Sequence, residues 1–157
     1  MASWHSPIER KQYSMMKSAE TTNVSSPHKV LQPEGWARPI GYANGMEARG
    51  KTIFVGGQIG WNGQCKFEAK DLPAQVRQTL ENIIAILREG GARPEHVTTM
   101  TWYVLDRKEY SSALKEIGAA YKATMGRHFP AMAVVQVSGL IEDEALVEIQ
   151  ATAVVPD

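Results

Sequence analysis

The sequence predicts an α+β fold: a mixed β-sheet with two helices on one of its faces, in the order β-β-α-β-α-β-β. Two segments, residues 71–90 and 106–126, carry apolar residues at helical spacing, and each begins with an aspartate that can cap a helix. Short segments rich in β-branched residues precede, separate and follow them. With 157 residues and 43% apolar side chains, the chain is long enough for one domain with a substantial core.

Residues 1–32 are expected to form a flexible tail, because they are rich in serine, threonine, lysine and methionine without a regular apolar pattern. Residues 33–157 are expected to form the single domain. The N-terminal segment lacks the apolar stretch of a secretory signal, and no apolar run in the chain approaches the length of a membrane span. We therefore expect a cytoplasmic protein without a membrane partner.

The first two strands are predicted over residues 42–47 and 52–59, with the turn Ala-Arg-Gly-Lys between them. Gly56 and Gly57 interrupt the second strand. Glycine inside a strand often marks a β-bulge, or a place where another backbone or a ligand comes close. The pair is not a dinucleotide-binding motif, because the G-x-G-x-x-G spacing is missing.

The first helix has its apolar positions in one stripe and ends at a glycine pair suited to a left-handed cap. The segment "HVTTMTWYVLD" predicts a strand over residues 96–106, and Asp106 with Glu109 predicts a capping box for the second helix. The chain closes with strands over residues 131–138 and 145–155, joined by an acidic turn.

Alternation along the last strand places Val147 and Ile149 on one face and Glu148 on the other. The same rule applied to the preceding strand leads us to expect Met132, Gln136 and Glu148 on one shared, half-polar face. Since the two helices cover only one face of the sheet, the other face is either solvated or buried by another subunit. A buried carboxylate would need a partner. From the residues alone, an exposed face or an ion pair between subunits is favoured over a catalytic role.

The balance of charge, with 17 basic and 17 acidic residues, disfavours nucleic acid as a partner. The single cysteine, Cys65, excludes a disulfide within the chain. No histidine or second cysteine stands at the spacing of a metal-binding pair. We expect neither a metal nor a cofactor.

Several stretches between residues 41 and 156 resemble the RidA/YjgF family of small enamine/imine deaminases. "FVGGQIGW" is similar to the family's SGQ strand, and "QVRQTLENIIAILREGGA" to its first helix, with the pattern Q-x-R-Q-x-L-x-N. "TTMTWYVLDRKEY" is similar to the next strand and cap, and "HFPAMAVVQVSGL" with "LVEIQATAVV" to the C-terminal pair of strands. The resemblance implies the fold predicted above, assembled as a homotrimer with an active site in each cleft between subunits.

The resemblance also implies roles for individual residues. In active deaminases of this family, a glutamate on the last strand positions the water that attacks the imine carbon, and here that glutamate is Glu148. A backbone amide and a tyrosine that help hold the substrate fall on Gly57 and Tyr42. The arginine that binds the substrate carboxylate falls on Met132, which cannot make that contact. Val134 stands where the family has a small residue or a cysteine lining the pocket.

Two further positions depart from the family, because Gly56 replaces a serine and Leu114 an asparagine. His128, just before the Phe-Pro pair, is the best candidate to take over from the missing arginine, as a neutral donor or a pH-sensitive group. For this histidine, too, an ordinary loop role is favoured.

The sequence therefore predicts a RidA-like hydrolase whose partner is a small enamine or imine metabolite that lacks the usual α-carboxylate. A non-catalytic trimer that binds a small ligand or regulates another protein remains an alternative. The family's older label of translation inhibitor or endoribonuclease is disfavoured by the zero net charge and by the lack of a stripe of basic and aromatic residues.

Overall fold

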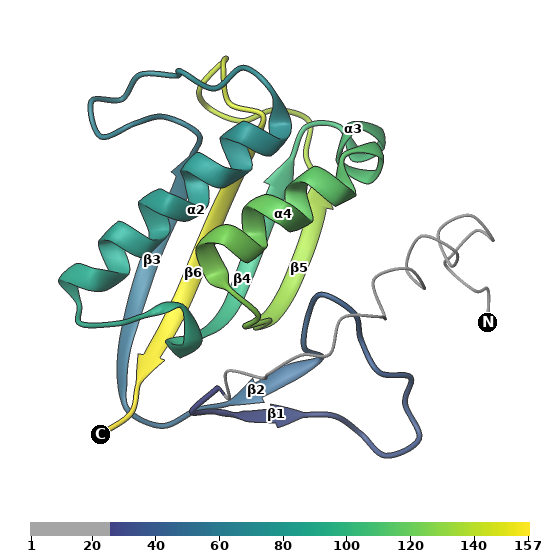
Figure 1. Ribbon diagram of the computed structural model, residues 1–157, viewed down its shortest axis with the longest axis vertical. Helices are drawn as coiled ribbons and strands as arrows, with labels where there is room; N and C mark the ends of the chain where they lie inside the picture. Colours follow the sequence, from purple (N-terminus) through teal and green to yellow (C-terminus); the bar gives the residue numbers. More distant parts are fainter. Residues whose placement is uncertain (1–25) are drawn as a thin grey trace.

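The structure is a computed structural model that describes residues 26–157 (Figure 1). Its centre is a four-stranded sheet in the order β3-β6-β4-β5, and β1 and β2 form a separate two-stranded sheet. The strands are β1 (Lys29–Leu31), β2 (Gly45–Glu47), β3 (Lys51–Ile59), β4 (Val97–Val104), β5 (Ala131–Gln136) and β6 (Val147–Val155). The helical segments are α2 (Leu72–Glu89), the short 3-10 helix η2 (Pro94–His96), α3 (Arg107–Ser112) and α4 (Leu114–Met125).

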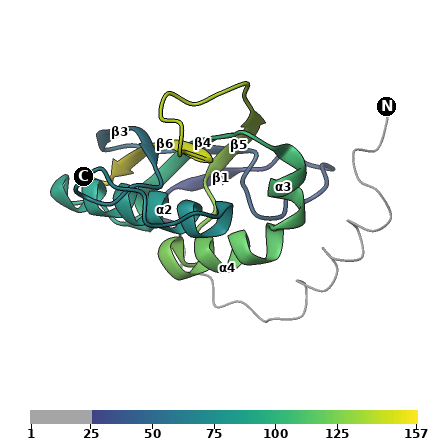
Figure 2. The same ribbon diagram turned by 90° about the horizontal axis from the view of Figure 1, so that it is seen from above.

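The four-stranded sheet is mixed, as predicted. Strand β6 runs antiparallel to both of its neighbours, whereas β4 and β5 are parallel. Helices α2 and α4 pack against each other on one face of this sheet (Figure 2). The core between them and the sheet includes Val76, Leu80, Leu87, Trp102 and Ile149, none more than 1% exposed. Within residues 26–157 no helix covers the opposite face, and the predicted α+β fold is confirmed.

Helix α2 begins and ends as its sequence predicts. The Asp71 carboxylate accepts a hydrogen bond from the backbone N–H of Ala74 at 2.9 Å, which satisfies one of the free donors of the first turn. Past the other end, Gly91 has a φ of +74°, a backbone conformation that favours glycine. Among the described residues no helix is long and apolar enough to cross a bilayer.

The predicted second helix is broken in two, so the expectation of one continuous helix over residues 106–126 was wrong. Asp106 caps α3 by accepting hydrogen bonds from the backbone N–H groups of Lys108 and Glu109. The chain leaves the helical conformation at Ala113, with φ −97° and ψ 11°, before α4 begins. The hydroxyl of Ser112 donates to the Glu109 carbonyl at 2.9 Å, a local bond of the kind that competes with helix continuation.

The N-terminal strands pair differently from what the sequence suggests. Strand β2 is shorter than the segment predicted over residues 42–47, and it pairs with β1. Strand β1 lies on the tail side of the boundary expected at residue 32, and just before it the His28 ring nitrogen Nε2 lies 2.7 Å from the Val154 carbonyl oxygen. A three-residue strand has no recognisable sequence pattern, which is why it was missed. Residues 1–25 of the expected tail lie outside the described residues.

Candidate functional site

Glu148 and Gly57 lie against each other at a β-bulge between β3 and β6. The pairing register shifts between Val55 and Gln58, so Gly56 and Gly57 together oppose a single residue of β6. A Cβ atom at Gly57 would overlap the Oε1 atom of Glu148, whereas a Cβ atom at Gly56 would meet nothing within 4 Å. The bulge predicted from the glycine pair is therefore confirmed, and Gly57 leaves the space that the carboxylate occupies.

Glu148 belongs to the face of the sheet that carries no helix. It pairs with Tyr103 of β4, and both side chains are half-buried, while their strand neighbours Trp102 and Ile149 are at most 1% exposed and point into the core. The alternation predicted for the last strand is thus confirmed. The carboxylate sits near the first residue of the central strand β6 and points to the face of the sheet away from α2 and α4, which we call the open face.

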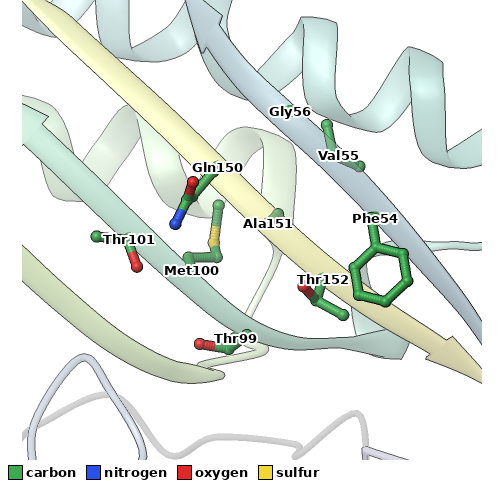
Figure 3. A pocket seen from close by; sticks show the side chains of 9 residues that line it. All are labelled: Phe54, Val55, Gly56, Thr99, Met100, Thr101, Gln150, Ala151 and Thr152. Carbon is green, nitrogen blue, oxygen red and sulfur yellow. The ribbon is translucent and has the colours of Figure 1, made fainter.

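A shallow hollow of about 340 Å³ lies on the same face, two residues further along β6 (Figure 3). Its rim and floor are formed by Phe54, Val55, Gly56, Thr99, Met100, Thr101, Gln150, Ala151 and Thr152. Phe54 is 79% exposed although it is a large aromatic residue in the middle of a strand. Its ring stands at the rim of the hollow, on the face of the sheet away from α2 and α4.

Met132 does not share a face with Glu148, so that expectation was wrong. Met132 pairs with the buried Met100, and Gln136 pairs with the buried Val104. Both therefore belong to the helix side of the sheet, where Met132 packs half-buried against the core. Alternation along one strand shows which of its own residues share a face. Only the pairing register between two strands shows which residues of both lie on the same face of the sheet.

Val134 lies on the same side of β5 as Met132, because it pairs with the buried Trp102. It is nevertheless 36% exposed, since β5 is the outer strand of the sheet. Within one chain, then, strand β4 lies between β5, which carries Met132 and Val134, and β6, which carries Glu148, and their side chains stand on opposite faces of the sheet. The predicted site residues therefore form two groups within one chain: Gly57 with Glu148, and Met132 with Val134.

Tyr42 belongs to the same group as Met132. The backbone N–H of Ala43 donates to the Pro130 carbonyl at 2.9 Å, and Ala43 forms a parallel bridge with Ala131 at the start of β5. Tyr42 is 44% exposed beside this bridge. The structure therefore brings Tyr42 next to the strand of Met132, on the outer edge of the sheet.

His128 is a buried histidine that lies away from Glu148. Its ring is 4% exposed, its Nε2 atom lies 2.6 Å from the Val97 carbonyl oxygen, and its own carbonyl accepts a hydrogen bond from the Tyr121 hydroxyl. Burial lowers the pKa of His128 and, with it, the tendency to carry a charge. Since Val97 begins the strand whose Tyr103 pairs with Glu148, the ring lies at the far end of β4 from the carboxylate.

The amide side chains of Gln75 and Asn82 on α2 bond to the backbone beside the strands that carry Glu148 and Gly57, a role that was not predicted from the sequence. Gln75 is 1% exposed, and its amide bonds to the segment that leads into β6. Asn82 donates to the end of β3. The sequence contained a signal for Gln75, which lies among the buried, mostly apolar positions of α2, and both amides belong to the pattern Q-x-R-Q-x-L-x-N. For residues 26–157, no group of three or more His, Cys, Asp or Glu side chains could hold a metal ion.

The sequence matches the Endoribonuclease L-PSP family over residues 37–155. It is 32% identical, over 130 residues, to the 2-iminobutanoate/2-iminopropanoate deaminase of Salmonella typhimurium, an alignment that covers 80% of this chain and 97% of that protein. A RutC family protein from Pyrococcus horikoshii is 35% identical over 127 residues, covering 80% of this chain and 96% of the relative.

Solved structures give the same result. A protein of the conserved Rid family from Yersinia pestis has a TM-score of 0.73 at 32% identity, covering 82% of this chain and 98% of that one. A member of the YjgF/YER057c/UK114 family from Mycobacterium tuberculosis has a TM-score of 0.55 at 30% identity, covering 74% and 88% of the two chains. The chain thus belongs to the Endoribonuclease L-PSP family, that of the RidA and YjgF proteins, and the predicted membership is confirmed.

Proposed function

We propose that this chain is a hydrolase of small enamines or imines in which Glu148 positions and activates the attacking water. The observation that carries the proposal is the contact of the Glu148 carboxylate with Gly57 at the bulge. It places a proton acceptor beside a backbone free of side-chain bulk, on a face of the sheet where a small molecule can approach. The name of the Salmonella typhimurium relative, a 2-iminobutanoate/2-iminopropanoate deaminase, supports the same chemistry.

In this mechanism the water oxygen attacks the imine carbon while a carboxylate oxygen of Glu148 takes a proton from the water. The electron pair of the C=N bond moves to nitrogen, which takes the water proton from Glu148, and a carbinolamine forms. In the collapse Glu148 accepts the hydroxyl proton and passes it to the nitrogen, while the C=O bond forms, the C–N bond breaks and ammonia leaves. An enamine first gains a proton on carbon and loses one from nitrogen, which converts it to the imine.

The chain works as a homotrimer in this proposal, because one protomer separates the residues that the family resemblance assigns to one site. Glu148 and Gly57 lie on the open face at β6 and β3, whereas Met132 and Tyr42 lie at the outer edge of the sheet. A second copy packed on the open face would bring its own outer edge to the Glu148 of the first. The exposed Phe54 gives this face the apolar contact area that such packing needs.

The substrate of this site lacks the usual α-carboxylate. Met132 occupies the position of the arginine that binds the carboxylate in active family members, and a thioether cannot donate hydrogen bonds. The soft, flexible methionine and the branched Val134 instead favour an apolar or neutral substituent on the substrate. The loss of a charged partner for a carboxylate costs about 2–5 kcal/mol of binding.

The test is release of ammonia from freshly generated imines, with and without a carboxylate beside the C=N carbon. We expect turnover of at least one uncharged imine, and turnover of 2-iminopropanoate far below that of an arginine-bearing relative. The Glu148→Gln variant should lose the activity, while Glu142→Gln, the same change at an exposed position of the loop before β6, should keep it. Turnover that survives Glu148→Gln would contradict the mechanism.

The same experiment separates the alternatives. Small ligands that raise the melting temperature without being consumed would instead favour a non-catalytic binding trimer. Cleavage of single-stranded RNA by wild type, lost on Glu148→Gln, would favour the nuclease that the family's name describes.

A further inference from the structure

Helix α2 holds both strands that carry the Glu148–Gly57 contact through a row of amide side chains. Gln75, Gln78 and Asn82 are spaced by three and four residues, so they follow one side of the helix. Each makes at least one hydrogen bond in the structure, and the bonds of Gln75 and Asn82 leave the helix to reach β3, β6 or the loops that join them. The row is therefore a connection between α2 and the two strands of the bulge.

Asn82 fixes the end of β3. Its Nδ2 atom donates to the carbonyl oxygens of Ile59 at 3.1 Å and of Trp61 at 2.8 Å. The Nε2 atom of Gln78 donates to the Asn82 Oδ1 atom at 2.9 Å, which holds the NH₂ group toward the strand. Ile59 is the residue of β3 that pairs with Glu148. Asn82 thus bonds directly to the cross-strand partner of the carboxylate-bearing residue.

Gln75 fixes the segment that enters β6. Its Oε1 atom accepts a hydrogen bond from the backbone N–H of Leu146 at 2.8 Å, and its Nε2 atom donates to the Glu144 carbonyl at 2.8 Å. Leu146 precedes Glu148 by two residues. The chain after β3 also passes close to Gln75, because a Cβ atom at Gly60 would lie 2.6 Å from the Gln75 Cβ atom. Gln75 thus lies between the chain that leaves β3 and the chain that enters β6, at one end of the bulge.

Glutamine and asparagine are chemically suited to holding the backbone at the ends of β3 and β6. A glutamine amide donates and accepts at once, which the Gln75 environment requires and which neither a carboxylate nor an ammonium group can do. Neutral amides also satisfy the strand ends without placing a second charge near Glu148, where a like charge would oppose its ionised form.

We propose that Gln75 and Asn82 are positioning residues that hold Glu148 against Gly57 by fixing β6 and β3 on either side of the contact. The effect of these residues on catalytic rate rests on the function proposed above, whereas their effect on the position of Glu148 does not.

The test uses near-isosteric variants that lack the hydrogen bonds, Asn82→Leu and Gln75→Met. Thr79→Val is the matched control: Thr79 is fully buried on the same helix, but its hydroxyl bonds only to the Gln75 carbonyl within α2. Displacing the carboxylate should lower kcat about 10-fold or more. KM should stay near the wild-type value, because Tyr42 and Met132 lie elsewhere. The control should lose stability but keep kcat.

A second measurement does not need activity. In ¹⁵N–¹H spectra, Asn82→Leu should shift the amide resonances of Ile59, Gly57 and Glu148, and Gln75→Met should accelerate hydrogen exchange of the Leu146 amide. Thr79→Val should do neither. Unchanged resonances and exchange in both variants, or equal changes in the control, would overturn the inference.

If Asn82→Leu does not fold, Gln78→Met removes only the bond that orients Asn82, and it should still shift the Ile59 and Glu148 resonances; no shift overturns the inference. If the wild-type protein hydrolyses no imine, the proposed function fails, while the spectra still decide whether the two amides position Glu148.

Discussion

The carboxylate of Glu148 occupies the space that a side chain at position 57 would fill. Gly57 and Glu148 come from neighbouring antiparallel strands, and the bulge in β3 turns the bare Cα of Gly57 toward the carboxylate. The two residues therefore depend on each other, since a larger residue in β3 and a glutamate in β6 cannot keep this geometry together.

Gly57→Ala is expected to displace the Glu148 side chain and lower imine turnover by about 10-fold or more. Gly56→Ala is the matched control, because it adds the same methyl group to the same bulge where nothing lies within 4 Å. Initial rates of ammonia release, measured on samples with matched circular dichroism spectra, check the prediction. Equal rates for the two variants would mean that the contact has no part in the reaction.

Met132→Arg is expected to raise turnover of carboxylate-bearing imines by about 10-fold or more, because a charged partner for a carboxylate contributes about 2–5 kcal/mol. Position 132 is half-buried at the outer strand, so the long arginine stem can cover the core edge while its head reaches solvent or a substrate. Met46→Arg, on half-buried β2, is the control for a general effect of added charge. A gain with the control as large as that with Met132→Arg would contradict the assignment.

Phe54→Asp is expected to dissociate the proposed trimer. Phe54 is 79% exposed in one chain, and a carboxylate placed at this position in an interface would be desolvated without a partner. Sedimentation equilibrium should give a trimer for wild type and monomers for the variant. Ile141→Asp, at a position 93% exposed in the loop before β6, should remain trimeric. A monomeric wild-type chain would refute the assembly itself.

The free energy of unfolding is expected to fall as the pH drops below about 6.5. Burial lowers the pKa values of both His96 and His128, so the unfolded chain binds protons in a pH range where the folded chain does not. His28, Glu95 and Arg93 are the charged or titratable groups around them, and the Glu95 carboxylate opposes the lowering. The contribution of the two histidines to the free energy of unfolding is thus fully present above about pH 6.5. It is lost as the pH falls toward the pKa values of the folded state.

Urea unfolding at several pH values between 5 and 8 checks this dependence. His128→Gln should flatten the curve, since it removes one titrating group and can keep a donor toward the Val97 carbonyl. A wild-type curve that is flat, or that rises toward acid, would show that the buried histidines do not control acid stability.

The sequence predicts the elements that local patterns determine. The apolar stripe and the caps at Asp71 and Gly91 define α2, and the alternation along β6 assigns Glu148 to the open face. The glycine pair predicts the bulge in β3. Each of these features depends on residues close together in the chain, so a single sequence contains the necessary information.

The features that were missed depend on pairing between distant segments. The position of Met132 relative to Glu148 follows from the register of β5 on β4, and both faces of β5 are apolar enough to allow either register. The pairing of β1 with β2 joins segments too short to have a pattern. The split at Ala113 is a departure of one residue from the helical conformation, across which the Ala113 N–H still donates to the Glu109 carbonyl, so the apolar pattern does not mark it.

Strand β6 has a neighbour on each side, whereas β5 has β4 on one side and little more than the Ala43 bridge on the other. The Glu148 carboxylate, to which the proposed function assigns the chemistry, therefore stands on a strand with a neighbour on each side, and position 132 on an outer strand. Mutations at the outer strand can be accommodated by small local shifts that leave the carboxylate in place. In the proposed function, this division would let the substituents accepted at the outer strand change while the water-activating carboxylate keeps its place.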